Sequence, residues 1–135
     1  MRKEIIEPDG VYPPTAAFSQ AIRVSGSDLV FLSGIIGMRV DGTMPETAAE
    51  QIDLAFRNLA RVMDASGGTM ADIVKVTLFI RDDFALIRDD LRAIRARYFT
   101  SEYPVSTLVQ VAGFAGADYL FEIEAIAVLP PEPVE

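Results

Sequence analysis

The stretch of sequence that decides the fold is Pro104–Val128, PVSTLVQVAGFAGADYLFEIEAIAV. Two runs within it, 106–112 and 119–128, are rich in β-branched and aromatic residues and therefore predict two strands separated by a short loop. Similar runs elsewhere in the chain predict further strands at 18–24, 29–34 and 74–80, with a short edge strand at 2–6. The turn sequence Ser25-Gly26-Ser27-Asp28 predicts that the strands on either side of it form a hairpin.

Two amphipathic helices are predicted between these strands. Thr47 and Glu50 have the spacing of a capping box, and apolar residues then recur at steps of three and four until Ser66-Gly67-Gly68 ends the pattern. The second helix is predicted over 83–99, where apolar residues recur with the same period. We expect both apolar stripes to belong to the core. The polar face of the second helix is predicted to be solvated and salt-bridged, and it carries Arg88, Arg92, Arg95 and Arg97.

This order of elements predicts an α+β fold, a layer sandwich in which two helices cover one face of a mixed or antiparallel sheet. The length of 135 residues suits a single domain spanning residues 1–135. The strands at 74–80 and 123–128 are apolar on both of their faces over much of their length. We therefore expect the helix-free face of the sheet to be covered by another subunit.

The composition excludes several classes of function. A formal net charge of −8 opposes a phosphate backbone, so no nucleic-acid partner is expected. The chain has no cysteine and no histidine, which removes disulfides, thiolate sites, Ser-His-Asp triads and the commonest metal ligand. Any proton transfer then falls to carboxylate, tyrosine, lysine or water. No run reaches the length of a membrane span and the N-terminus lacks an apolar segment, so we expect a cytoplasmic protein without a membrane partner.

Several short motifs, in order along the chain, resemble those of the YjgF/RidA family, also called the endoribonuclease L-PSP type. They are Phe18-Ser19-Gln20-Ala21, Phe31-Leu32-Ser33-Gly34, Asp72-Ile73-Val74-Lys75-Val76-Thr77 and the C-terminal block quoted above. The resemblance implies a chorismate-mutase-like protomer that assembles as a homotrimer, with small-molecule pockets at the subunit interfaces. It also implies hydrolysis of 2-imino and 2-enamino acids to 2-oxo acids and ammonia, without a metal or an organic cofactor.

The resemblance further implies which residues form the site. The family's glutamate, which orients or activates water, corresponds to Glu122, and its strand-end glycine corresponds to Gly34, with Ser33 beside it. The tyrosine position holds Phe18. The arginine that binds the substrate carboxylate corresponds to Ser106, which is followed by Thr107. Since removing such a charge-assisted pair typically costs about 3–5 kcal/mol, we hypothesise that the ligand lacks a carboxylate.

Three functions of different class follow. The first is a homotrimeric metabolite-binding protein or specialised hydrolase that retains Glu122 and accepts neutral or cationic ligands. The second is a true imine or enamine deaminase in which another cation, from Arg23, Arg39 or Arg97, replaces the missing arginine. The third is a protein-binding or chaperone-like scaffold with a small or apolar interface pocket. A ribonuclease is not supported, because the chain lacks histidine for phosphodiester chemistry and its net charge opposes RNA.

Overall fold

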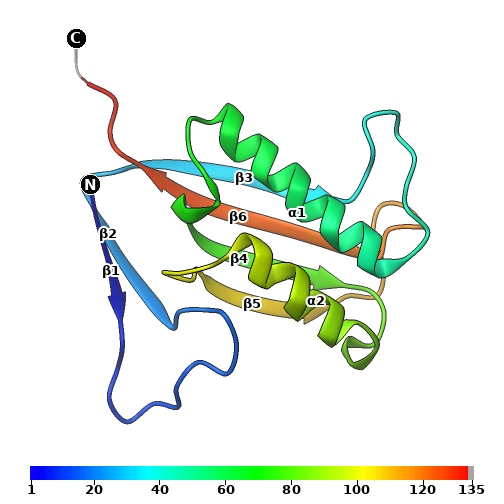
Figure 1. Cartoon of the computed structure of the whole chain (residues 1–135), viewed down its shortest axis with the longest axis horizontal. Coiled ribbons are helices and arrows are strands. Elements are labelled where there is room, and N and C mark those ends of the chain that lie inside the picture. Colours follow the sequence, from blue (N-terminus) through cyan, green and yellow to red (C-terminus); the bar gives the residue numbers. More distant parts are fainter. Residues whose placement is uncertain (134–135) are drawn as a thin grey trace.

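The computed structural model of the chain describes residues 1–133. Figure 1 shows its strands and helices in sequence colours. In chain order they are β1 (Arg2–Ile6), β2 (Ala21–Ser25), β3 (Asp28–Ile36), α1 (Ala48–Ala65), a 3-10 turn (Met70–Asp72), β4 (Ile73–Ile80), α2 (Phe84–Tyr98), β5 (Val105–Gln110) and β6 (Phe121–Leu129). Neither helix in this described part is long and apolar enough to cross a membrane.

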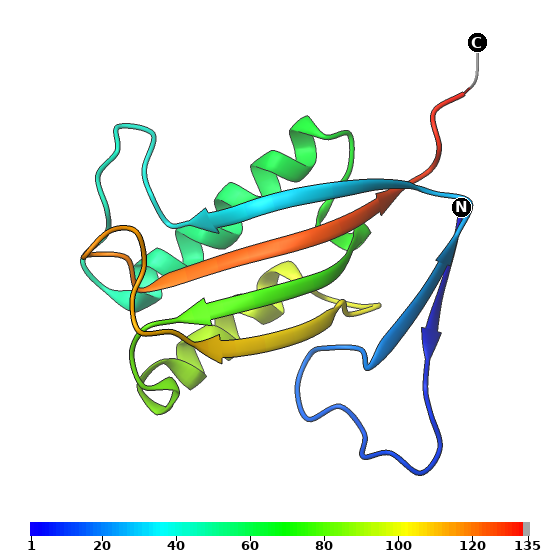
Figure 2. The ribbon, with the colours of Figure 1, turned by 180° about the vertical axis from the view of Figure 1, so that it is seen from behind.

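The main sheet has four strands in the order β3-β6-β4-β5. Strand β4 runs parallel to β5, whereas β6 is antiparallel to both of its neighbours, so the sheet is mixed. Both helices lie on the same face of this sheet, and the view from behind shows the other face without a helix (Figures 1 and 2). The predicted α+β arrangement, with two helices on one face of the sheet, is confirmed. Strand β5 forms one edge of the sheet.

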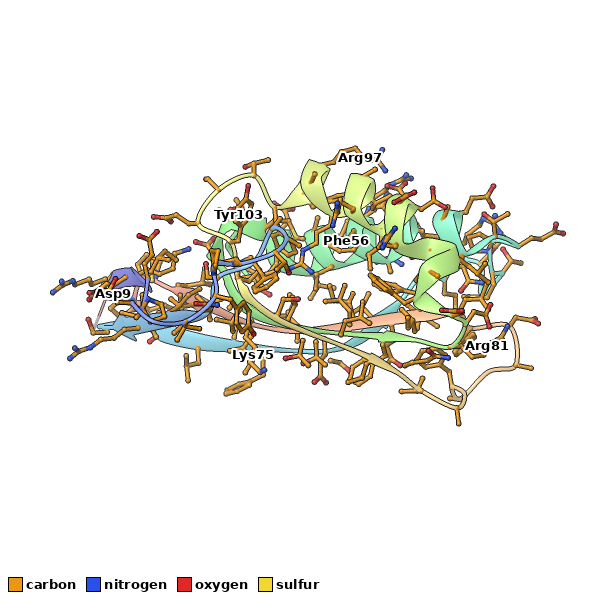
Figure 3. All side chains as sticks on the ribbon, turned by 90° about the horizontal axis from the view of Figure 1, so that it is seen from below. Asp9, Phe56, Lys75, Arg81, Arg97 and Tyr103 are labelled. Atoms are coloured by element: carbon orange, nitrogen blue, oxygen red, sulfur yellow. The ribbon has the colours of Figure 1, made fainter. Side chains whose placement is uncertain are left out.

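The core lies between the helices and the sheet, where the two apolar stripes were predicted to pack. Phe56 of α1 is fully buried, and its ring stacks on Tyr98 of α2 and Phe121 of β6 at centroid distances of 5.3 and 6.1 Å. Figure 3 shows Phe56 in this layer and Lys75 on the opposite face of the sheet. Alternation along β6 places Phe121 and Ile123 in the core and turns Glu122 to the helix-free face.

The predicted hairpin at the turn 25–28 is wrong. Strand β2 pairs with β1 from Ile6↔Ala21 to Arg2↔Ser25 and forms a separate two-stranded sheet. Strand β3 instead pairs with β6, starting at Asp28↔Leu129. Gly26 turns the chain with a φ of 61°, as the sequence indicated, but β1 and β6 provide the hydrogen-bond partners that the hairpin would have supplied. The turn therefore links two sheets and does not close a hairpin.

The helix starts follow the predicted caps in part. Thr47 accepts a hydrogen bond at its Oγ1 from the backbone N–H of Glu50 (3.2 Å), which is one half of the predicted capping box. At the start of α2, Asp83 Oδ1 accepts from the N–H of Ala85 (3.0 Å). Each cap satisfies one of the backbone donors that the first turn of a helix leaves free.

Candidate functional site

Glu122 and Gly34 meet on the helix-free face of the sheet. Strand β3 has a β-bulge between Leu32 and Ile35, so that Ser33 and Gly34 together occupy the place opposite a single residue of β6. A Cβ atom on Gly34 would lie only 2.0 Å from Glu122 Oε1. Glycine is therefore required here because the carboxylate of Glu122 lies against the backbone of β3.

Two side-chain amides of α1 hold the backbone on both sides of this pair. Gln51, which is 1% exposed, donates from Nε2 to the carbonyls of Pro45 (3.0 Å) and Asp118 (2.8 Å) and accepts from the N–H of Leu120 (2.9 Å). Its contact with Leu120 fixes the start of β6 two residues before Glu122. A polar residue within the apolar stripe of α1 is the signal in the sequence for such a backbone contact. This role of Gln51 was not predicted.

Asn58, one further polar residue of α1, fixes the end of β3. Its Nδ2 donates to the carbonyls of Ile36 (3.1 Å) and Met38 (3.0 Å). Ile36 is the β3 residue that pairs with Glu122. Glu122 is thus positioned by two contacts of α1: Asn58 holds the end of β3 beside it, and Gln51 holds the loop that precedes β6.

Phe18 and Ser106 meet on the other side of the sheet, beside α2. The N–H of Ser19 donates to the carbonyl of Pro104 (2.9 Å), and its hydroxyl donates to the carbonyl of Tyr103, so the segment with Phe18 is tied to the start of β5. Next to these contacts lies a pocket of about 280 Å³. Its lining comes from the 16–18 segment, from α2 and from β5, and includes Phe18, Phe84, Leu91, Ser106 and Leu108.

Arg95 supplies a guanidinium at Ser106. Its Nη1 donates to Ser106 Oγ (3.0 Å), its Nε donates to the carbonyl of Ala17 (3.1 Å), and its Cζ lies 5.8 Å from the ring centroid of Phe99. Burial lowers the pKa of Arg95 from its ordinary value. Its Nη2 is buried and, among residues 1–133, has no hydrogen-bond partner. A buried donor without a partner is rare in proteins.

None of the three arginines predicted to replace the missing cation lies at Ser106. Arg39 instead donates to Thr43 Oγ1 (3.1 Å), Arg97 pairs with Asp53 (3.0 Å), and Arg23 is exposed on β2. The prediction that the arginines of α2 form one solvated, salt-bridged face is also wrong for Arg95, because its side chain folds under the 16–18 segment toward Ser106. In an amphipathic helix the sequence does not indicate which of four arginines at the border of the apolar stripe turns inward.

Within one chain the predicted site residues form two separate groups. Ser106 of β5 pairs with Val76 of β4, which pairs in turn with Ala125 of β6. Glu122 lies three residues from Ala125 along β6, and its side chain faces the opposite side of the sheet. Two strand spacings of about 4.8 Å and three residue rises of about 3.4 Å put the backbones of Ser106 and Glu122 about 14 Å apart. Thr107 alternates with Ser106 and lies on the helix-free face, in a row with Thr77 and Glu124. Phe18 and Ser106 thus form one group, and Ser33, Gly34 and Glu122 another.

The two groups have complementary chemistry. The pocket beside α2 offers guanidinium donors between apolar walls, which suits a small anion with an apolar part. The helix-free face offers a carboxylate that can accept a proton from water. Residues 1–133 contain no group of three or more acidic side chains arranged to hold a metal ion.

Comparison with known proteins gives consistent matches over nearly the whole chain. The family model described as Endoribonuclease L-PSP matches residues 10–129. The RutC family protein YjgH of Escherichia coli is 38% identical over 115 residues, which cover 85% of each chain. A 2-iminobutanoate/2-iminopropanoate deaminase of Dermatophagoides farinae is 36% identical over 131 residues, covering 94% of this chain and 97% of its own. These two relatives therefore match over most of their length.

A solved structure supports the fold. The structure of YyfB, a protein of the Rid family from Yersinia pestis, superimposes with a TM-score of 0.87 at 24% identity and covers 96% of this chain and 100% of its own. At this identity the likeness concerns the fold alone. It includes the arrangement of sheet and helices on which both groups of site residues depend.

Proposed function

The chain belongs to the endoribonuclease L-PSP family, the YjgF/RidA family, and we propose that it hydrolyses 2-imino and 2-enamino acids to 2-oxo acids and ammonia. One observation carries this proposal: the guanidinium of Arg95 donates to Ser106 Oγ in a small pocket. Ser106 is the residue that the family resemblance assigns to the position of the carboxylate-binding arginine. In this proposal α2 would supply the cation that β5 lacks. The name of the mite relative, an iminobutanoate and iminopropanoate deaminase, supports the same reaction class.

Arg95 would hold the substrate carboxylate. Its Nη2 is buried without an acceptor, and a carboxylate oxygen is the acceptor that a guanidinium binds most strongly. A small shift of the 16–18 segment, which covers Arg95 through the Ala17 carbonyl, would open this nitrogen to a ligand in the pocket. The Ser106 hydroxyl would donate its own hydrogen to the same carboxylate while it accepts from Nη1.

Glu122 would activate water. As the water oxygen bonds to the carbon of the C=N group, the Glu122 carboxylate takes up one proton of the water. The nitrogen gains one proton, passed on from the Glu122 carboxyl, which gives a carbinolamine and restores the carboxylate. Collapse of the carbinolamine then breaks the C–N bond, releases ammonia and leaves a C=O group. An enamine substrate first gains a proton on carbon and loses one from nitrogen to become the imine. Gly34 contributes by leaving room for the carboxylate over β3.

A homotrimer would bring the two groups together. Within one chain Glu122 and Ser106 lie on opposite sides of the sheet, so a complete site needs the β5 edge of one copy beside the helix-free face of the next. That face carries large exposed apolar side chains, with Phe31 73% and Leu29 55% exposed. Burying them in an interface is favourable in proportion to the apolar area covered. Interface pockets of this kind would be the active sites.

The other two hypotheses fit the pocket less well. A neutral or cationic ligand would leave the buried Nη2 of Arg95 without an acceptor, and it would meet three arginines in the lining. A scaffold that binds protein through an apolar pocket does not account for those arginines either.

The proposal is tested by replacing Arg95. With 2-iminopropanoate generated in the assay, we expect Arg95→Gln to lower kcat/KM by about a hundredfold or more, because a charge-assisted contact to the carboxylate is lost. The variant also loses the hydrogen bonds to Ser106 and to the carbonyl of Ala17, so we expect the unfolding free energy to fall by about 1–3 kcal/mol. Rates are therefore compared at a temperature at which both proteins are fully folded. Arg61→Gln on α1, which removes the same charge away from the pocket, should leave both quantities unchanged. Equal rates for Arg95→Gln and the unmodified protein would contradict the proposal and favour a ligand without a carboxylate.

A further inference from the structure

The pocket beside α2 is lined by three arginines from one side of that helix. Arg88, Arg92 and Arg95 are spaced by four and three residues, which places them on the same helix face. None of the described residues that line this pocket is acidic. In a chain with a net charge of −8, this is a local concentration of positive charge. One arginine would be sufficient to hold one carboxylate.

The other charged pocket near a helix is different. The groove beside α1 is lined by Arg39, Arg57 and Arg61, but also by Glu50 and Asp53. Arg57 Nη2 and Asp53 Oδ2 are 2.6 Å apart, so part of that positive charge is already neutralised. Arg39 donates to Thr43 Oγ1 (3.1 Å), so two of the groove's three arginines have protein partners, and its lining also carries two carboxylates. The groove therefore favours an anionic ligand less than the pocket beside α2 does.

The arginines of the α2 pocket have few such partners. Arg88 has one carboxylate within 4.0 Å, that of Asp89 at 3.9 Å, and both side chains are more than half exposed. For Arg92 and Arg95 no carboxylate of residues 1–133 lies within 4.0 Å. An exposed pair at the distance of Arg88 and Asp89 contributes little. The positive charge in the pocket is thus available to a ligand.

From this arrangement we propose that the substrate carries a second carboxylate, so that the preferred imino acids are those of dicarboxylic amino acids. This rests on the proposed function, in which Arg95 holds the carboxylate next to the C=N group. Arg92 lies one helical turn from Arg95, about 4.5 Å along the axis, and Arg88 about 6 Å beyond it. Arg92, supported by Arg88, would bind the carboxylate at the far end of the substrate side chain.

The size and walls of the pocket agree with such a ligand. A volume of about 280 Å³ lies just below the usual range for small-molecule sites and suits a molecule of the size of an amino acid. Phe18, Phe84 and Leu91 supply an apolar surface between the arginines, against which one or two methylene groups can pack. A long apolar side chain would have to displace the water around Arg88 and Arg92 without replacing its hydrogen bonds, which is unfavourable.

Binding of non-reactive probes tests this inference separately from catalysis. We would measure the affinities of succinate, succinamate and succinamide by titration calorimetry on the whole protein. Succinate and succinamate have the same shape, but succinamate carries one carboxylate and an amide in place of the second. We expect succinate to bind about tenfold more tightly than succinamate, and this preference to decrease as salt is added.

Variants assign the preference to residues. Arg92→Gln and the double variant Arg88→Gln/Arg92→Gln should bind succinamate as the unmodified protein does, while the tenfold preference for succinate falls to about twofold or less. Arg61→Gln, with the same change in net charge, should retain the full preference. Arg88 and Arg92 are exposed, so their replacement should not affect folding.

The outcomes separate the two proposals. Equal affinities for succinate and succinamate in the unmodified protein would overturn the proposal that the substrate carries a second carboxylate. They would leave the deaminase proposal intact. A preference that survives in the Arg88→Gln/Arg92→Gln variant would also overturn it. If succinamide binds as well as succinamate, the carboxylate contact of Arg95 itself is contradicted, and with it the proposed function.

Discussion

The two faces of the four-stranded sheet differ sharply although the same strands build both. On the face under the helices, Phe56, Phe121 and Ile123 are fully buried and form a dry core. On the other face Phe31 is 73% exposed. Glu122 lies between Ile36 and Phe79, and Glu124 lies beside Thr77. The helices need only one face of the sheet to bury their stripes, so the chain by itself leaves the second face uncovered.

The difference teaches where stability and function are located. Groups on the covered face are held by packing and contribute mainly to folding, whereas groups on the helix-free face and at the β5 edge are free to meet a ligand or another copy. Exposed apolar side chains beside carboxylates are costly to leave in water and are more typical of an interface than of a solvent-facing sheet. Substitutions on the two faces should therefore affect different measurements.

The largest effect is expected for Phe56→Ala, on the covered face. The ring stacks between Tyr98 and Phe121, so its loss should lower the free energy of unfolding by about 3–5 kcal/mol. Phe31→Ala removes a ring of the same size from the helix-free face. It should change the free energy of unfolding of the isolated protomer by less than about 0.5 kcal/mol. Urea unfolding at low protein concentration measures both. Similar losses for the two variants would show that the faces do not differ in the protomer.

The next effect concerns the buried amide that links the covered face to the helix-free site. Gln51→Ala leaves two carbonyls and the N–H of Leu120 without their partner, which should cost about 1–3 kcal/mol of unfolding free energy. It should also lower kcat with little change in KM, because Glu122 follows Leu120 on β6. Arg61→Ala, on the exposed side of the same helix, is the control and should change neither. A normal kcat in Gln51→Ala would restrict this amide to a structural role.

Gly34→Ala is expected to affect activity far more than stability. The added methyl group would lie 2.0 Å from Glu122 Oε1, so the carboxylate must move, and we expect a loss of kcat of about a hundredfold. The free energy of unfolding should fall by only about 1 kcal/mol, because the displaced group is the end of a flexible side chain. Gly113→Ala, where the added atom meets nothing within 4 Å, provides the control. An active Gly34→Ala enzyme would argue against Glu122 as the group that activates water.

The smallest effect on protomer stability, but a clear effect on assembly, is expected for Phe31→Ser. Sedimentation velocity should show that the variant shifts from a trimer toward the monomer, because less apolar area is buried between copies. Leu86→Ser removes an equally exposed apolar side chain from α2 and should leave the assembly unchanged. A protein that is monomeric without any substitution would contradict the proposed interface sites.

Much of the fold could be predicted because it depends on local pattern. The periods of the apolar residues located both helices, and Thr47 and Asp83 cap them near the expected positions. The family resemblance, which the match over residues 10–129 confirms, also led to the Gly34–Glu122 pair that the register of β3 and β6 brings together. The hairpin prediction failed because a turn sequence fixes a change of direction but does not choose the partner strand.

The sequence by itself determined the helices and strands, the family and the serine at position 106, because each of these is a property of residue types and their spacing. Only the tertiary structure decided that Arg95 turns inward to Ser106 and that Glu122 lies on the other side of the sheet. Both depend on how α2 and the 16–18 segment pack against β5, and contacts between residues far apart in the chain leave no periodic signal in it. The sequence places a serine at position 106, and the packing of α2 on the sheet brings the guanidinium of Arg95 beside it.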